Sequence, residues 1–237
     1  MENERKGNGI FLGVVGVATL IVAIIGASFA YFSIQASSEE GAVNLTAYEF
    51  NASLSMSQVY GPGDKGLIPV NPMGNVPGAS APDNTNLAYA LNVAQKCTDN
   101  GGFGVCALYE VTVSNDSDAP LVLNGVIKTL ANTAAGASSE PFSHLQFRTA
   151  TKSGNAYTIE STGHDIIVAG NDEVSLGSAI TVPAKSGTTP GTYTMYVVVY
   201  LNDTGDDQSA EMGATYSGQL IFTSSGTANQ LTGTFGL

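Results

Sequence analysis

The stretch Thr192-Tyr193-Thr194-Met195-Tyr196-Val197-Val198-Val199-Tyr200-Leu201 decides the fold class, because it combines β-branched and aromatic residues with a repeat of two. The residues that lie in phase along one face of this predicted strand are Tyr193, Met195, Val197, Val199 and Leu201. A strand this apolar favours the interior of a protein. We therefore expect it to be central in a sheet and buried.

The same repeat of two appears in residues 107–114. One face of that predicted strand carries Leu108, Glu110 and Thr112, and the other carries Tyr109, Val111 and Val113, which we expect to face the core. Residues 115–120, Asn-Asp-Ser-Asp-Ala-Pro, are typical of a turn. Residues 121–127 form the next predicted strand, which we expect to lie near residues 107–114 in one sheet.

Further strands are predicted at short intervals, with turn residues between them. They are residues 44–56, 145–149, 156–160, 165–168, 173–182 and 216–223. Residues 58–86 interrupt the series with a Pro- and Gly-rich insertion, and residues 86–96 predict one short helix behind an Asn cap. Many short strands with this punctuation favour a mainly β fold, a sandwich or barrel, over a parallel sheet with crossover helices.

An apolar leader precedes the strands. Residues 7–38 contain no charged side chain and follow Arg5 and Lys6 directly. This pattern predicts a signal peptide over residues 1–30, in which Ser28 and Ala30 form the small-x-small cleavage site and Tyr31 becomes the first mature residue. The remaining residues 31–237 are then extracytoplasmic, and we expect them to form a single β-sandwich domain.

Two other interpretations of the leader remain open. An apolar run of more than about 20 residues is long enough to cross a bilayer as a helix, so residues 10–32 could stay as a membrane anchor. A pilin-like leader could instead be cut after Gly7, although the acidic residue that such pilins carry within the apolar helix is missing. Retention of the leader would leave the protein on the membrane and keep Tyr31 within the chain.

Charge and cysteine content narrow the function classes. The formal net charge is −12, and only six of the eight Lys and Arg remain once Arg5 and Lys6 are removed. Nucleic acid is therefore not an expected partner, because phosphate binding needs a basic face.

The only cysteines, Cys97 and Cys106, bracket a glycine-containing stretch, and in an exported chain such a close pair predicts a disulfide.

Two segments carry a family resemblance. The first is residues 26–32, Gly-Ala-Ser-Phe-Ala-Tyr-Phe, at the end of the leader. The second is residues 196–208, Tyr-Val-Val-Val-Tyr-Leu-Asn-Asp-Thr-Gly-Asp-Asp-Gln, followed by residues 214–222, Ala-Thr-Tyr-Ser-Gly-Gln-Leu-Ile-Phe. Both segments resemble the TasA and camelysin group of Gram-positive surface proteins, whose leaders are processed by a SipW-type signal peptidase. Together they cover about a fifth of the chain.

The resemblance implies an antiparallel jelly-roll sandwich that forms a homo-polymer, a fibre of the biofilm matrix, when the N-terminal segment of one subunit completes a sheet of the next. The chain departs from the group in its disulfide, its insertion and its long leader. Residues 31–38 fit such a donor strand, because Phe32, Ile34 and Ala36 alternate with polar residues. The same segment could instead pair within its own subunit or stay disordered.

Catalytic motifs are missing from the sequence: it has no His-Glu-x-x-His, no Gly-x-Ser-x-Gly and no phosphate loop. The resemblance allows a camelysin-like metallopeptidase, but the only histidines, His144 and His164, are not expected to bind a metal. We therefore expect no enzyme and no cofactor. A weak calcium site is predicted at Asp203, Asp206 and Asp207, although the EF-hand spacing is missing.

The leading expectation is a structural subunit of an extracellular fibre or matrix. The alternative is a monomeric β-domain, adhesive or ligand-binding, held to the membrane by residues 10–32. Cleavage before Tyr31 distinguishes the two, because a free donor segment exists only after cleavage.

Overall fold

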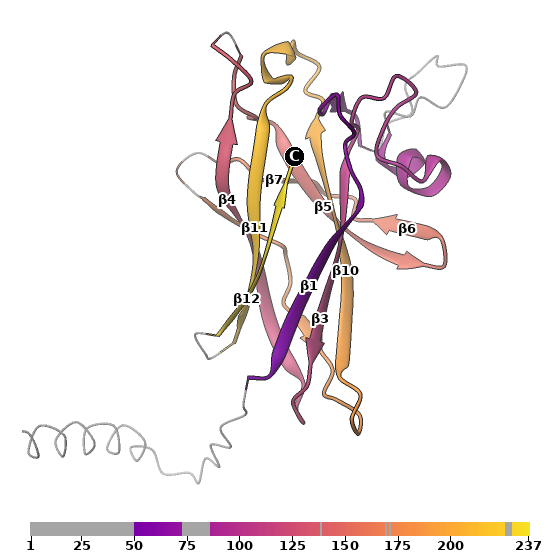
Figure 1. The fold of residues 1–237 in the computed structure, drawn as a ribbon, viewed down its shortest axis with the longest axis vertical. Helices are drawn as coiled ribbons and strands as arrows, with labels where there is room; N and C mark the ends of the chain where they lie inside the picture. The colour runs from indigo at the N-terminus through magenta and orange to yellow at the C-terminus, as the bar shows by residue number, and fades with distance from the viewer. Residues whose placement is uncertain (1–49, 73–85, 138, 169, 171, 226–228) are drawn as a thin grey trace, which may run out of the picture. The chain divides into compact units, whose positions relative to one another are not determined.

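The computed structural model describes residues 50–72, 86–137, 139–168, 170, 172–225 and 229–237. These residues belong to one compact unit, Tyr48–Leu237, in which two β-sheets pack face to face (Figure 1). The strands are antiparallel to their partners except for the short pair β2 and β10. The prediction of a mainly β sandwich is confirmed for this part of the chain.

The first sheet is built around β10, the strand from which the sequence analysis began. Its order is β1 (Ala52–Tyr60), β3 (Ala107–Asn115), β10 (Gly191–Asn202), β5 (Leu145–Ser153) and β6 (Ala156–Ile159). Two short strands extend it, β2 (Pro69–Val70) beside β10 and β7 (His164–Asp165) beside β5.

The second sheet is smaller. Its order is β12 (Gln230–Gly236), β11 (Thr215–Ser224), β4 (Leu121–Thr133) and β8 (Glu173–Ser175), and β9 (Ile180–Val182) also pairs with β4. A short 3-10 helix, η2 (Ser209–Glu211), lies in the connection from β10 to β11.

The strand β10 is central and buried, as predicted. It pairs with β3 on one side and β5 on the other, and every side chain from Met195 to Leu201 is buried. Met195, Val197, Val199 and Leu201 enter the core between the sheets. The alternate residues Tyr196, Val198 and Tyr200 are buried on the outer face, in a second apolar cluster.

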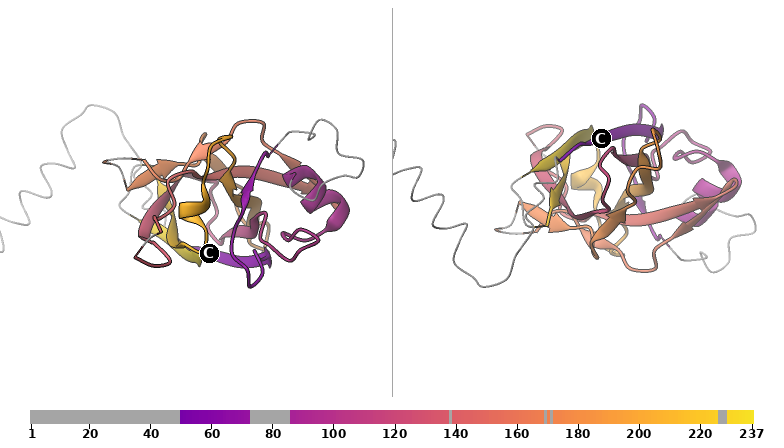
Figure 2. Two further views of the ribbon diagram at one scale, coloured as in Figure 1. Left: turned by 90° about the horizontal axis from the view of Figure 1, so that it is seen from above. Right: turned by 90° about the horizontal axis from the view of Figure 1, so that it is seen from below.

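The second cluster exists because a further layer covers the outer face of the first sheet. The helix α2 (Leu87–Tyr89) begins at Asn86, whose Oδ1 accepts from the backbone N–H of Ala88 at 2.8 Å, and it continues as the π-helix η1 (Ala90–Ala94). Figure 2 shows this helical segment outside the two-sheet sandwich. The predicted helix is therefore confirmed, and it explains why Leu108 is as buried as its neighbour Tyr109.

One pairing prediction was wrong. Residues 107–115 and 121–133, as β3 and β4, lie in different sheets, because the turn between them carries the chain across the sandwich. The buried side chain of Asn115 organises this crossing. Its Nδ2 donates to the carbonyls of Ala119 at 2.8 Å and Pro183 at 2.9 Å, while its Oδ1 accepts from the N–H of Ser117.

Two further elements differ from expectation. The predicted strand over residues 173–182 is divided into β8 and β9 at Gly177, whose φ of 105° suits glycine and breaks the ladder. The strand β12 was not predicted, because five of its seven residues are glycine, threonine or glutamine and only Leu231 and Phe235 are apolar. The Pro- and Gly-rich insertion is partly folded onto the sandwich, where Leu67 and Val70 are buried.

The predicted leader, residues 1–30, and residues 73–85 of the insertion lie outside the described residues. Within the part of the chain that is described, no helix has the length and apolar character needed to cross a membrane.

Candidate functional site

The strands β1 and β12 form one edge of the sandwich. They stand at the same end of the two sheets, where β1 pairs only with β3 and β12 only with β11 among the described strands. Each therefore has one side without a ladder partner in this part of the chain. An edge of this kind is a template for another extended segment.

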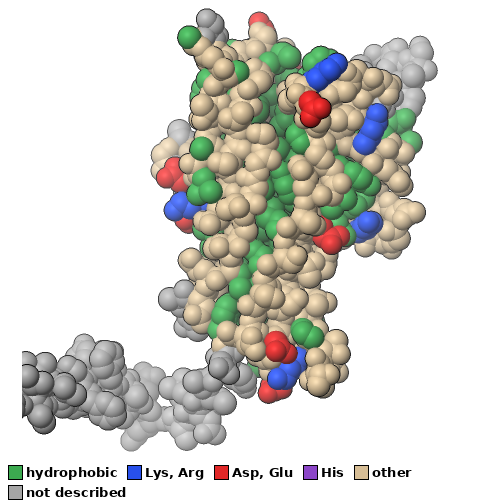
Figure 3. Space-filling view, in the orientation of Figure 1, with side chains coloured by type: hydrophobic (Ala, Val, Ile, Leu, Met, Phe, Trp, Pro, Cys, Tyr) green, Lys and Arg blue, Asp and Glu red, His purple; other side chains and the backbone are tan. Residues whose placement is uncertain are grey.

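Apolar side chains line the space between these two strands. Figure 3 shows them as a band along the length of the sandwich, with polar surface on both sides. We call this band the edge seam and define it by Ala52, Leu54 and Met56 of β1 and Leu231, Gly233 and Phe235 of β12. The β1 members are partly buried against the main core, and the serines between them are exposed.

Gly233 sets how closely the two edge strands approach. A Cβ atom at this position would lie 3.2 Å from the sulfur of Met56 and 3.3 Å from Cδ2 of Leu54. The two β1 side chains therefore lie across the glycine, and a side chain there would fit only if Met56 and Leu54 shifted. The middle of the edge seam is closed by side-chain packing, and no backbone ladder joins β1 to β12.

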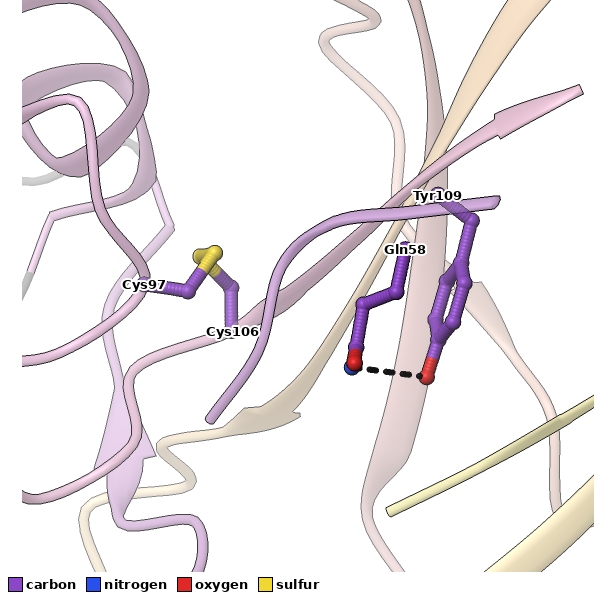
Figure 4. Close-up of a disulfide and its surroundings, with 4 residues drawn as sticks. All are labelled: Gln58, Cys97, Cys106 and Tyr109. Atoms are coloured by element: carbon purple, nitrogen blue, oxygen red, sulfur yellow. Dashed lines mark hydrogen bonds between the residues drawn. A yellow bond between two sulfur atoms is a disulfide. The ribbon is translucent and has the colours of Figure 1, made fainter. Parts of the chain in front are cut away.

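Aromatic rings support the edge seam from beneath. The ring centroid of Phe235 lies 5.2 Å from that of Tyr109 and 5.9 Å from that of Tyr216. The hydroxyl of Tyr109 donates to the carbonyl of Gly236 at 2.7 Å and accepts from Nε2 of Gln58 at 3.4 Å (Figure 4). Burial raises the pKa of Tyr109 to about 12, against the opposing effect of these hydrogen bonds, so the phenol remains a donor at neutral pH.

A cavity of about 320 Å³ lies where both edge strands end. Its lining comes from the loop that follows β1, Pro62–Leu67, from Leu237 after β12, and from Phe142 and Gly213–Thr215. Leu67 and Phe142 are buried members of the main core. The edge seam therefore ends in an apolar hollow that could take a side chain of an added segment.

The arrangement suits addition of an extended peptide. Such binding uses backbone hydrogen bonds along a free strand edge for affinity and alternate side-chain pockets for specificity. The edge seam supplies the first element, because each edge strand has an unpaired side among the described strands, and the hollow at its end supplies one pocket.

Six of the residues predicted to act at the N-terminus lie outside the described residues. They are Ser28, Ala30 and Tyr31 of the cleavage site and Phe32, Ile34 and Ala36 of the donor segment. Signal cleavage and strand donation therefore stay predictions.

The predicted disulfide is present. Cys97 and Cys106 are bonded and at most 1% exposed, in the second apolar cluster (Figure 4). The bond holds the chain between η1 and β3, so it fixes the covering layer against the first sheet. Its role is structural, because neither sulfur is accessible to a solution thiol.

The three predicted calcium ligands lie in one exposed loop, in which the carboxylates organise turns. Asp203 Oδ1 accepts from the N–H of Gly205 at 2.8 Å, and Asp207 Oδ1 accepts from the N–H of Ser209 at 2.9 Å. Among the described residues, none donates a hydrogen bond to the Asp206 carboxylate. The described residues contain no group of three or more acidic, His or Cys side chains arranged to hold a metal ion. Calcium binding by Asp203, Asp206 and Asp207 stays a prediction.

His144 belongs to a cluster that sequence reasoning missed. Its Nδ1 lies 2.5 Å from Oε1 of Glu211 and 3.0 Å from Oγ of Ser143, and the same Glu211 oxygen accepts from that hydroxyl at 2.9 Å. A Ser-His-acid triad needs the serine and the acid on opposite ring nitrogens. Here both contact Nδ1, so the cluster anchors a loop.

The edge seam was only partly visible in the sequence. The β1 side was included in the strand predicted for residues 44–56, but no strand was predicted for the β12 side. The signal was available, because Leu231, Gly233, Phe235 and Leu237 recur at every second position. What the alternation could not show is that the two strands meet.

No family model matches the chain, and no curated protein matches its sequence. Among solved structures, a FixG-related protein from Vibrio parahaemolyticus aligns at a TM-score of 0.34 and 8% identity over 78% of this chain and 94% of its own. The CooA pilin subunit of enterotoxigenic Escherichia coli aligns at a TM-score of 0.28 and 19% identity, over 55% of this chain and 76% of its own.

A family 123 glycoside hydrolase from Clostridium perfringens aligns at a TM-score of 0.30 and 8% identity, over 55% of this chain and 20% of its own. We draw no functional argument from similarities at this level.

Proposed function

We propose that this protein is a structural subunit of an extracellular fibre or biofilm matrix, which polymerises when the N-terminal segment of one subunit adds to the edge seam of the next. The observation that supports the proposal is the seam itself. Two neighbouring edge strands present apolar residues at every second position and have an unpaired side each among the described strands. An unpaired strand edge is a template for pairing with another chain, and it is an aggregation liability unless it is used or covered.

The donor segment has the matching pattern. Phe32, Ile34 and Ala36 would pack on the apolar side chains of the seam, while Ser33 and Gln35 would face solvent. The connection is long enough to reach a neighbour, because residues 37–51 can span at most about 50 Å when extended. A jelly-roll arrangement of the strands, as in the fibre family that the sequence resembles, is part of the same proposal.

Export determines when assembly can begin. In the proposal, a signal peptidase cuts after Ala30 and thereby frees Tyr31 and the donor segment outside the membrane. The uncut chain would keep the same segment next to a membrane anchor, residues 10–32, where it could not enter a neighbouring subunit. Assembly therefore begins only after export.

The test compares two lysine substitutions in the donor segment of the mature chain, residues 31–237. Ile34→Lys places a charge on the face that enters the seam, and Gln35→Lys places the same charge on the opposite face. We expect Ile34→Lys to abolish high-mass species in size-exclusion chromatography with light scattering. We expect Gln35→Lys to polymerise like the parent chain.

Equal polymerisation of the two variants would contradict strand donation by this face. A parent chain that stays monomeric at every concentration would contradict the fibre altogether and favour the alternative, a membrane-anchored β-domain with an adhesive or ligand-binding role. The described residues give no support to the metallopeptidase alternative, and we do not propose it.

A further inference from the structure

A second cleft lies at the opposite edge of the sandwich from the edge seam. It has a volume of about 450 Å³, which is within the range of small-molecule sites. We call it the threonine cleft and define it by Thr149, Thr151, Thr158, Glu160, Tyr193 and Met195, which line it together with residues of the turn between β8 and β9.

The cleft exists because the two sheets differ in width on this side. The first sheet continues through β5 to β6, whereas the second ends at β8 and β9, which are three residues each. The inner face of β5 changes from apolar to polar at the same point. Leu145 and Phe147 are buried in the core, and the next residues of that face, Thr149 and Thr151, are polar. The hydroxyls therefore lie where the second sheet no longer covers the first.

A ligand in this cleft must be recognised by side chains, because the backbone groups of its floor are already paired. The backbones of β10, β5 and β6 are paired with one another along its floor, with Val197 opposite Thr149 and Thr151 opposite Thr158. What remains is five hydroxyls, those of Thr149, Thr151, Thr158, Ser178 and Tyr193, each both donor and acceptor, and the carboxylate of Glu160. Glu160 Oε2 accepts from Thr149 Oγ1 at 2.9 Å and lies 3.6 Å from Nε2 of His164, which has no hydrogen-bond partner among the described residues.

The walls are apolar and uncharged. Tyr193, Met195 and Ile180 contribute them, and no Lys or Arg is among the lining residues. An anionic ligand is disfavoured, because the nearest charge is that of Glu160 and the whole chain carries −12. The preferred ligand has many hydroxyl groups, an apolar face that can pack on an aromatic ring, and no negative charge.

We propose that the threonine cleft binds a neutral carbohydrate of one or two sugar residues. The ring hydroxyls of a pyranose exchange hydrogen bonds with Thr151, Thr158 and Glu160, and its C–H face packs on Tyr193. The proposal does not depend on fibre formation, because the cleft and the edge seam lie at opposite ends of the strand orders. A fibre of such subunits would carry one sugar site on each subunit.

The test uses the full mature chain and three neutral disaccharides, lactose, maltose and cellobiose, at about 10 mM, which is tenfold above a 1 mM dissociation constant. Saturation-transfer NMR detects binding, and amide shifts locate it. The double variant Thr151→Val with Thr158→Val keeps the β-branched shape and removes two exposed hydroxyls. The control is Thr181→Val, an exposed threonine of β9 next to the lining residue Ile180.

We expect at least one disaccharide to shift the amides of Thr149, Thr151 and Thr158. We expect the double variant to bind about tenfold more weakly, since two hydrogen bonds are lost, and Thr181→Val to bind like the parent. The proposal is overturned if none of the disaccharides binds, if the double variant binds equally well, or if the peptide of residues 31–38 occupies the cleft in their place.

Discussion

Glu211 carries a negative charge inside the protein. It is 3% exposed, and its carboxylate accepts from the N–H of Ser143 at 2.8 Å and from the Ser143 hydroxyl at 2.9 Å, beside Nδ1 of His144. Burial alone would raise the pKa of Glu211, but the hydrogen bonds from Ser143 and His144 outweigh it and lower the pKa. We predict that Glu211→Gln lowers the free energy of unfolding by about 2 kcal/mol at pH 7.

The pH dependence follows from the direction of that shift. A carboxylate whose folded pKa is depressed stabilises the protein above its unfolded pKa, and this contribution is lost as the pH falls through the folded value. This contribution of Glu211 should therefore be complete above about pH 4.5 and shrink below it. Urea titrations of the parent and Glu211→Gln at several pH values measure it. A difference that grows as the pH falls below about 4.5 would contradict this assignment.

Glu173→Gln is the matched control for Glu211→Gln. Glu173 pairs with Lys128 at 3.6 Å, and both side chains are more than 40% exposed. A solvent-exposed ion pair contributes little, so we expect a change of less than about 0.5 kcal/mol.

Buried polar residues could not be paired from the sequence, because their partners are distant in the chain. The guanidinium of Arg148 donates to the hydroxyl of Tyr200 at 2.9 Å and to the carbonyl of Glu160 at 2.8 Å. Arg148 alternates with the core residue Phe147 along β5, so the strand pattern alone predicts that Arg148 is exposed. In the structure Arg148 is buried, because Tyr200 of β10 and the carbonyls of Glu160 and Ser161, just after β6, hold its guanidinium, and these partners were not predicted.

At the scale of elements, the disulfide fixes the layer formed by α2 and η1. Replacing Cys97 and Cys106 by alanine should lower the free energy of unfolding by about 2–3 kcal/mol, because the unfolded chain regains the freedom of a short loop. The sulfurs are at most 1% exposed, so a reductant should act only at denaturant concentrations that open the layer. Denaturant titration with and without reductant measures both effects. Rapid reduction of the native protein would contradict the burial.

Gly233 tests the packing between β1 and β12. A Gly233→Val side chain would collide with Met56 and Leu54, so we predict a loss of about 1–3 kcal/mol and separation of the two edge strands. Gly236→Ala is the control in the same strand, because its Cβ would meet only the carbonyl oxygen of Tyr216, at 3.4 Å. Thermal unfolding measures both. Equal stability of the two variants would show that the edge strands are not in contact at Gly233.

Strands were predictable where alternation is strong and residues are β-branched. The predictions for residues 107–114, 192–201 and 216–223 agree with β3, β10 and β11 to within a residue or two. Prediction failed where glycine alters the pattern. Gly177 divides one predicted strand into β8 and β9, and Gly233 interrupts the apolar face of β12, where it makes room for β1.

At the scale of the whole molecule, the sequence predicted the class of fold but not which strands share a sheet. The repeat of two is the same in either sheet, so it could not show that β3 and β4 lie on opposite sides of the sandwich. For the same reason it could not show that β1 and β12 meet at one edge. The donor half of the proposed assembly was predicted from residues 31–38, and the acceptor half required the structure.

The most direct test of the account is the mass of the protein in solution with and without its N-terminal segment. Sedimentation velocity would compare residues 31–237 with residues 48–237, which contain the compact unit alone. Strand donation predicts polymers that grow with concentration for the longer chain and a single monomeric species for the shorter one. A longer chain that remains monomeric, or a shorter chain that polymerises equally well, would contradict assembly by strand donation.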